Sequence, residues 1–227
     1  MTDLRNTLDF YRDPEYIAEL RKIGIPIIIQ QFTFSALNML GVIFVGQKGD
    51  ASVAAVGLAG QIAFILNLVH FGIISGAAMF TAQFWGRQDI PNLRRVLGLC
   101  LVLAAAASLI FFSVSQFIPT QLLGIYSKDA AVIAIGADYL RIFSWTFLFF
   151  AVTLSYSLVM RSTGDAKTPT IISVGALSIS TVLSYALIFG RFGLPELGVQ
   201  GAAVAAVIAR GLECVALLLV AYAQRSP

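Results

Sequence analysis

Long apolar stretches separated by short polar ones dominate the pattern of this chain. Six of them are long enough for a membrane-spanning helix, which needs about 20 mainly apolar residues. They cover residues 24–46, 53–84, 93–118, 130–160, 168–190 and 197–223. Continuous runs of this length exclude transmembrane barrel strands, which alternate over about 10 residues. The pattern therefore predicts an all-α membrane protein in which residues 24–223 form six transmembrane helices.

The first 23 residues follow a different pattern. Asp13, Pro14 and Glu15 form a typical helix start, with an N-cap residue, a proline and an early acid. The apolar residues of 16–23 then share one helical face. We expect residues 1–23 to contain a cytoplasmic amphipathic helix that leads into the first span.

Composition and charge narrow the class of protein. Hydrophobic residues make up 58% of the chain and charged residues 12%, against about 25% charged residues in soluble domains. This excludes a water-soluble enzyme domain. The net charge of +3 is scattered through short loops. A nucleic-acid partner is therefore not expected, because such binding needs basic residues gathered on one face.

Positive charges divide unequally between the two sets of loops that alternate along such a chain. The N-terminal segment, the 85–95 and 161–168 loops and the tail carry ten Lys and Arg residues. The opposite loops carry three, namely Lys48, Lys128 and Arg191. Because cytoplasmic loops are enriched in Lys and Arg, we expect a multi-pass plasma-membrane protein with both termini in the cytoplasm.

Residues for catalysis or metal binding are scarce. The chain has one histidine and two cysteines, and neither of its Gly–Lys segments has the spacing of a phosphate-binding loop. It also has no nucleophile elbow and no pair of catalytic carboxylates. We predict that the protein is not an enzyme, holds no metal and takes no cofactor.

Polar residues inside apolar spans are the candidates for function, because they are costly in a membrane. In the first span Gln31, Ser35 and Asn38 share one helical face. In the second span Asn67 and His70 are three residues apart. Such residues can line an aqueous cavity or hydrogen-bond neighbouring helices. For His70 a bond to a neighbouring carbonyl is the favoured interpretation.

Two further residues, Pro26 and Glu213, stand out in the first and last spans. Pro26 either occupies the first turn of its helix or, if the helix is continuous from Asp13, kinks it internally. Glu213 can pair with Arg210 three residues earlier. If that partner moved away, Glu213 could bind a proton or a substrate cation.

A series of short motifs runs in order through nearly the whole chain. They are SALN (35–38), IFVGQ (43–47), SGAA (75–78), AQFWG (82–86), RSTGD (161–165), LIFG (187–190) and GVQGAA (198–203). Together they resemble the N-terminal half of MATE (multidrug and toxic compound extrusion) transporters. The resemblance implies one six-helix lobe of a MATE-like transporter of the MOP superfamily, with residues 224–227 beginning the linker to a second lobe.

The resemblance also implies a function and partners. Members move cationic amphipathic compounds through a cleft between two lobes in exchange for H⁺ or Na⁺. The implied partners are the lipid bilayer, a small-molecule substrate and a second six-helix lobe, either a C-terminal half or a second copy. The hypothesis is that Gln31, Ser35, Asn38, Asn67 and His70 line the cleft and that Pro26 allows the first helix to bend.

Three positions depart from the family pattern. Members commonly carry an aspartate, an asparagine and a threonine where this chain has Gly41, Ser180 and Ala206. In members these residues contribute to a cation and proton site. Ion coupling would then fall to a second lobe or to Glu213.

Two alternatives remain. One is a flippase for a lipid-linked sugar, which needs a strongly cationic cleft; this is disfavoured because only Arg141 and Arg210 lie near the spans. The other is a half-size lobe without ion coupling that forms homodimers, which parallel lobes make feasible.

Overall fold

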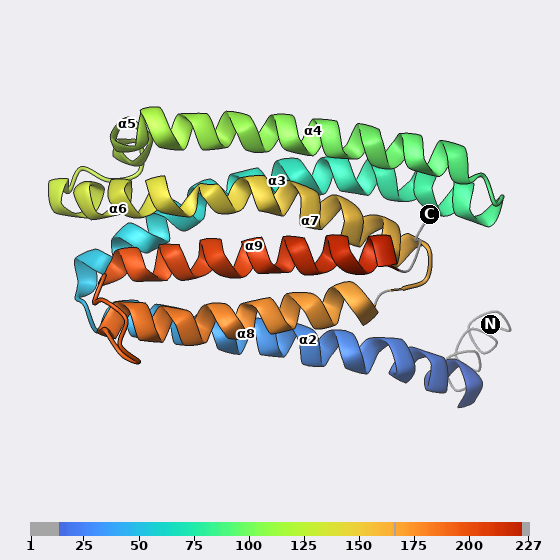
Figure 1. Ribbon diagram of the computed structural model, residues 1–227, viewed down its shortest axis with the longest axis horizontal. Coiled ribbons are helices and arrows are strands. Elements are labelled where there is room, and N and C mark those ends of the chain that lie inside the picture. Colours follow the sequence, from blue (N-terminus) through green and yellow to red (C-terminus); the bar gives the residue numbers. More distant parts are fainter. Residues whose placement is uncertain (1–13, 166, 224–227) are drawn as a thin grey trace, which may run out of the picture.

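The computed structural model describes residues 14–165 and 167–223, and the regular structure of this part of the chain is helical. The helices are α2 (Pro14–Gly46), α3 (Asp50–Gly86), α4 (Ile90–Phe117), α5 (Pro119–Gly124), α6 (Ala130–Phe143), α7 (Trp145–Ser162), α8 (Lys167–Phe189) and α9 (Val199–Ala223). The long helices lie side by side along one axis, and α2 begins at the end of the bundle where α9 finishes (Figure 1). The predicted all-α fold class is confirmed.

Local sequence explains where several helices start. The Asp89 side chain accepts a hydrogen bond from the backbone N–H of Asn92, and a proline occupies the first turn of α4. Asp129 caps α6 in the same way, accepting from the N–H of Ala131 at 2.9 Å. Such caps satisfy N–H groups that the first helical turn leaves without partners.

The run expected at 130–160 contains two helices rather than one. α6 and α7 meet at Ser144 with a bend of 44°. The Arg141 carbonyl at this break accepts from the Ser144 hydroxyl at 3.0 Å and from Gln116 Nε2 of α4 at 2.7 Å. The bend therefore has an identifiable cause, because side chains take over hydrogen bonding where the helical ladder is interrupted.

Four of the helices, α3, α4, α8 and α9, are long and apolar enough to cross a membrane, and the bent pair α6–α7 qualifies as a fifth span. In α2 the apolar part among the described residues is Gln31–Gly46. Five of the six expected spans are thus supported by length and composition, while the first stays a prediction.

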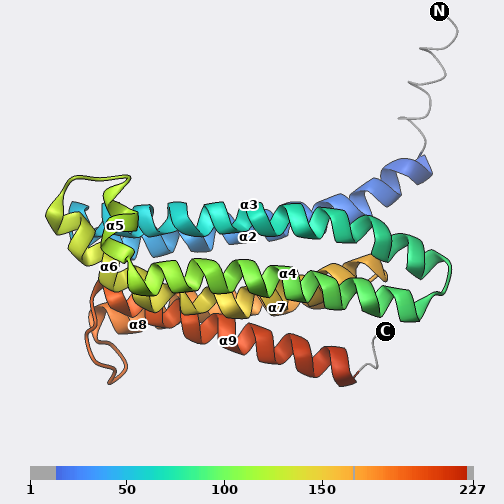
Figure 2. The same cartoon turned by 90° about the horizontal axis from the view of Figure 1, so that it is seen from above.

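Helix α2 settles one question about the N-terminal region. It continues without interruption from Pro14 to Gly46, so Pro26 lies in the helix interior rather than in its first turn. Figure 2 shows that the beginning of α2 turns away from the other helices. Bending at Pro26 during function stays a prediction. The expected segments 1–13 and 224–227 lie outside the described residues.

Small residues mediate the closest helix packing. Gly201, Ala205 and Ala209, four residues apart on α9, are buried, as expected for a stripe that lets helices approach closely. Gly72 and Gly76 on α3 have the same spacing, but both are exposed and a Cβ atom at either position would have no atom within 4 Å. The core itself is formed around Ile62, Leu66, Leu123, Leu140 and Phe147.

Many large apolar side chains remain exposed on the outside of the bundle, among them Phe32, Phe71, Phe117 and Ile171. A soluble monomer rarely exposes apolar surface on this scale. The exposed side chains are suited to contact with lipid.

Candidate functional site

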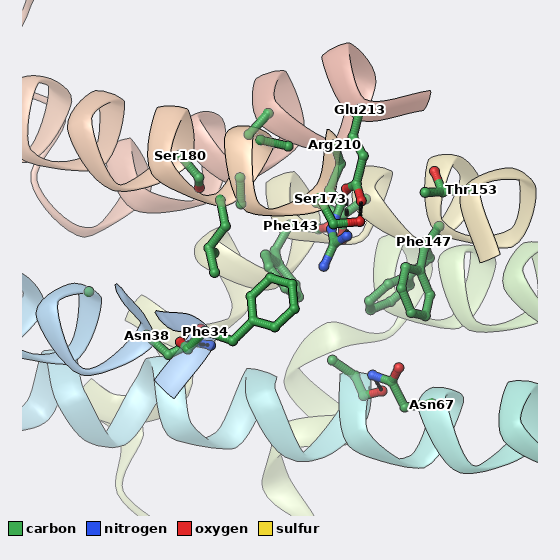
Figure 3. A pocket seen from close by; sticks show the side chains of 18 of the residues that line it. Phe34, Asn38, Asn67, Phe143, Phe147, Thr153, Ser173, Ser180, Arg210 and Glu213 are labelled. Atoms are coloured by element: carbon green, nitrogen blue, oxygen red, sulfur yellow. Dashed lines mark hydrogen bonds and ion pairs between the residues drawn. The ribbon is translucent and has the colours of Figure 1, made fainter. Parts of the chain in front are cut away.

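A cavity of about 680 Å³ lies inside the bundle, with walls from α2, α3, α6, α7, α8 and α9. Its volume falls within the range of about 300–1,000 Å³ typical of small-molecule sites. Part of the wall is aromatic, with Phe34 from α2 and Phe143 and Phe147 on either side of the α6–α7 bend (Figure 3), and Phe150 one turn further along α7. The bend thus places three rings, spaced four and three residues apart, on one side of the cavity.

Neutral polar groups are distributed over this wall. Asn38 of α2 and Asn67 of α3 line the cavity, and each donates to a carbonyl four residues earlier, at 2.8 and 2.9 Å. These bonds occupy amide donors and leave the amide oxygens as acceptors. Hydroxyls are supplied by α7 and α8, from Thr146, Thr153, Ser157, Ser173, Ser180 and Ser184.

The cavity also contains an ion pair whose carboxylate is buried. Glu213 accepts a hydrogen bond from Arg210 Nη1 at 2.6 Å through one oxygen and from the Ser173 hydroxyl at 2.6 Å through the other. The Glu213 side chain is 2% exposed and that of Arg210 is 40% exposed. The Arg210 guanidinium lies 5.1 Å from the centre of the Phe150 ring. Figure 3 shows Arg210, Glu213 and Ser173 together on one side of the cavity.

Of the residues expected from the sequence, the structure brings Asn38, Asn67 and Glu213 to this cavity. Gln31 and Ser35 are exposed on α2 and lie outside its lining. Gln31 precedes Phe34, the first α2 residue of the lining, whereas Ser35 follows Phe34 but is exposed on a part of the helix surface that the lining does not include. Their place in a cleft between two lobes stays a prediction.

His70 does not line this cavity, and its place in a cleft between two lobes stays a prediction. Its ring is fully buried, and Nε2 lies 3.1 Å from the Ser108 hydroxyl and 3.2 Å from the Ala104 carbonyl, both on α4. An aromatic contact with Phe150 covers one side of it. The arrangement fits a neutral imidazole that links α3 to α4.

Sequence reasoning missed several lining residues. The spacing of Phe143, Phe147 and Phe150 is a signal that could have identified an aromatic face. Ser173 offers no comparable signal, because its contact with Glu213 depends on how α8 packs against α9. The three positions that depart from the family pattern, Gly41, Ser180 and Ala206, line the same cavity.

One end of the bundle is joined by a second ion pair. Lys48, in the loop between α2 and α3, contacts Glu196 in the loop between α8 and α9, with Nζ 2.5 Å from Oε1. This hydrogen bond and the Lys48 charge lower the pKa of Glu196 below its usual value. Lys48 also lies 5.4 Å from the centre of the Phe189 ring. The pair therefore connects the loop that follows α2 to the loop between α8 and α9.

Clusters of side chains that could bind a metal were searched for among the described residues. No group of three or more His, Cys, Asp or Glu side chains there could hold a metal ion. The polar groups of the described lining are amides, hydroxyls, the Arg210–Glu213 pair and Arg161.

Comparison with known proteins gives consistent matches. The family model MatE matches residues 26–186, more than two thirds of the chain. A probable multidrug resistance protein NorM of Rhizobium meliloti is 31% identical over 210 residues, covering 90% of this chain and 43% of that protein. The probable multidrug resistance protein YoeA of Bacillus subtilis is 29% identical over 185 residues, covering 81% of this chain and 40% of that protein. The chain spans less than half the length of these relatives.

Solved structures agree on the fold. An outward-facing multidrug resistance MATE family transporter of the MOP superfamily matches with a TM-score of 0.81 and 19% identity, covering 92% of this chain and 45% of that one. An inward-facing one matches with a TM-score of 0.80 and 16% identity, covering 93% and 48%. Family model, relatives and fold agree, and the family model covers well over half of the chain, which therefore belongs to the MatE family of membrane transport proteins.

Proposed function

We propose that this chain forms one lobe of a secondary active antiporter that extrudes cationic amphipathic compounds in exchange for H⁺ or Na⁺. The observation that carries the proposal is the cavity of about 680 Å³ inside a bundle of apolar helices. It combines aromatic walls with a few amides, hydroxyls and one ion pair. This composition suits a ligand with an apolar body and a charge.

The wall chemistry supports a cationic ligand in particular. A cation over the face of an aromatic ring is attracted by the ring's quadrupole, most strongly where water is excluded. Arg210 already makes this contact with Phe150. The described lining includes a further ring at Phe34, which Figure 3 shows extending into the cavity.

The proposal includes a second lobe, either a C-terminal half or a second copy, and a place in the plasma membrane. It is supported by the length of the relatives, of which this chain covers 40–43% in the two cases above. The proposed orientation, with the start of α2 and the end of α9 in the cytoplasm, follows the excess of Lys and Arg in the corresponding loops.

The flippase alternative is weakened by the same cavity. A pyrophosphate group would need several free cationic side chains. The described lining has two guanidinium groups, and that of Arg210 is paired with Glu213. Arg161 alone remains to balance such a ligand.

The direct test is binding of tetraphenylphosphonium, a permanently charged aromatic cation, to the protein in lipid nanodiscs by isothermal titration calorimetry. Asn38→Leu and Asn67→Leu should each weaken binding about two- to tenfold, the value of one polar contact. Gln61→Leu is the matched control, because Gln61 is an exposed amide on α3 outside the lining. Absence of binding, or equal affinities in all four proteins, would contradict the proposal. Exchange of the cation against imposed H⁺ or Na⁺ gradients in vesicles then tests the antiport.

A further inference from the structure

We propose that one end of this bundle binds the headgroups of anionic phospholipids through a group of exposed basic residues. The group, which we call the basic end surface, comprises Arg87, Arg94, Arg95, Arg161 and Lys167. They belong to two corners of the chain, the one between α3 and α4 and the one between α7 and α8. All but one of them lie outside the cavity lining, so the surface does not depend on the proposed function.

The two corners lie at the same end of the bundle. Helix α4 packs against α7, and the two helices run in opposite directions, so that the start of α4 and the end of α7 meet (Figure 1). Figure 2 shows the same arrangement from above. Arg94 and Arg95 lie in the second turn of α4 and Arg161 in the last turn of α7. The fold therefore brings both groups of positive charge to one end.

The two carboxylates of these corners are used in helix capping. Asp89 accepts from the backbone N–H of Asn92 at 3.2 Å. Asp165 accepts from the backbone N–H of Thr168 at 3.1 Å. Neither of the two ion pairs among the described residues includes a member of the basic end surface. Five basic side chains thus share the corners with two acidic ones, and no carboxylate of the described residues pairs with any of the five.

The loops at the opposite end of the bundle have no such excess. Residues 47–50, 125–130 and 190–198 carry three basic and three acidic residues. One of these basic residues, Lys48, is paired with Glu196. Complementarity to a negatively charged headgroup is therefore a property of one end of the molecule, and a basic segment beside a membrane span attracts anionic lipid.

Helix length places the basic end surface at the level of the headgroups. Helices α3 and α4 contain 37 and 28 residues, whereas the hydrocarbon core takes about 20. The polar corner that joins them therefore lies outside the core. Trp85, a residue type enriched at the membrane–water interface, occupies the last turn of α3. Arg94 and Arg95 lie about 6–8 Å inside the start of α4, from where long side chains can extend to lipid phosphates.

A chain of hydrogen bonds orients Arg95 for this contact. The Asn92 side chain donates to Asp89 at 2.6 Å and accepts from Arg95 Nη1 at 3.1 Å. Because the direct partner of Arg95 is a neutral amide, the charge of the guanidinium is not compensated by it. The remaining N–H groups of Arg95 can donate to phosphate oxygens, which guanidinium groups bind in charge-assisted hydrogen bonds.

The spread of the charges favours a lipid over a free anion. The basic side chains come from two corners, and Arg87, Arg94, Arg95 and Lys167 lie outside the lining of the cavity. A single small anion is held tightly only where several donors converge on it. A surface with separated charges at headgroup level suits the phosphates of a bilayer, which are already concentrated there.

The test is binding of dioctanoylphosphatidylglycerol, a soluble anionic phospholipid, to the detergent-solubilised chain by native mass spectrometry. Dioctanoylphosphatidylcholine, which has a phosphate but no net charge, is the ligand control. Wild type should bind the anionic lipid at least about fivefold more tightly than the neutral one. The double variant R94Q/R95Q should bind the anionic lipid more weakly, by about fivefold for each arginine removed, with unchanged affinity for phosphatidylcholine.

Two further double variants make the test specific to one end of the molecule. K128Q/R191Q removes two exposed charges at the opposite end and should bind both lipids as wild type does. R87Q/K167Q removes two other charges of the basic end surface and leaves the hydrogen bonds of Asn92 in place. It should lose affinity for the anionic lipid as R94Q/R95Q does, so the result does not depend on the folding of one variant.

The outcomes decide between a lipid surface and its alternatives. Equal affinities of wild type for the two lipids would overturn the proposal, and so would wild-type affinity for the anionic lipid in both variants of the basic end surface. An equal loss in the opposite-end variant would attribute binding to the net charge of the chain and overturn it as well. Displacement of the lipid by millimolar inorganic phosphate would identify a free anion as the ligand instead.

Discussion

Replacement of Gly201 by alanine should destabilise the bundle at the contact between α8 and α9. A Cβ atom at this position would lie 2.7 Å from the Leu187 carbonyl carbon, 2.8 Å from its oxygen and 2.9 Å from its Cβ. Backbone atoms cannot rotate away, so α9 would have to move relative to α8. The change is more severe than at Gly136, where the nearest atom is the flexible end of Leu123 at 2.9 Å.

Overpacking of this kind typically costs about 1–3 kcal/mol. The better helix propensity of alanine returns up to about 1 kcal/mol. For a chain of this size each kcal/mol corresponds to roughly 2–4 °C in Tm. We therefore expect the Tm of Gly201→Ala to fall by several degrees in a thermal unfolding experiment in nanodiscs.

The matched control is Gly72→Ala on α3. Gly72 is exposed and a Cβ there would meet no atom within 4 Å, so the change should leave Tm unaltered or raise it slightly. A Tm for Gly201→Ala equal to or above that of Gly72→Ala would refute the inferred close approach of α8 and α9.

Two further predictions concern Asp165 and His70. Hydrogen bonds from the Thr168 side chain and backbone lower the pKa of Asp165 below its ordinary value of 3.8. Asp165→Ala should therefore cost about 1 kcal/mol at pH 7, and the Tm difference from wild type should shrink as pH falls through the lowered pKa; a difference that grows in acid would contradict this. His70→Leu removes contacts to α4 and should lower Tm by several degrees. An unchanged Tm in that variant would contradict a role of His70 in joining α3 to α4.

The sequence was sufficient to predict the class of fold because membrane-spanning helices require long apolar runs and leave few alternatives. It did not reveal the bend at Ser144. That bend depends on Gln116, a residue of another helix, which satisfies the carbonyl of Arg141. Neither partner carries a local signal for a break.

Some candidate residues of the site could be predicted from the sequence and others could not, because contacts within one helix follow from local spacing whereas the extent of the cavity depends on other helices. Helical spacing correctly related Arg210 to Glu213, since residues three apart meet on one face. The same rule grouped Gln31 with Asn38, but the cavity meets α2 only from Phe34 onward. Periodicity gives the face of a helix, whereas the length over which that face is covered depends on tertiary packing.

Helix α2 contributes both to the cavity and to the outside of the bundle. Asn38 and Val45 line the cavity, while Ser35 and Met39 are exposed on the same helix. The bundle matches inward-facing and outward-facing transporters with nearly equal TM-scores of 0.80 and 0.81, so its fold is compatible with both arrangements. Because α2 runs without interruption from Pro14 to Gly46, a tilt of this helix would change the cavity wall and the exposed surface together.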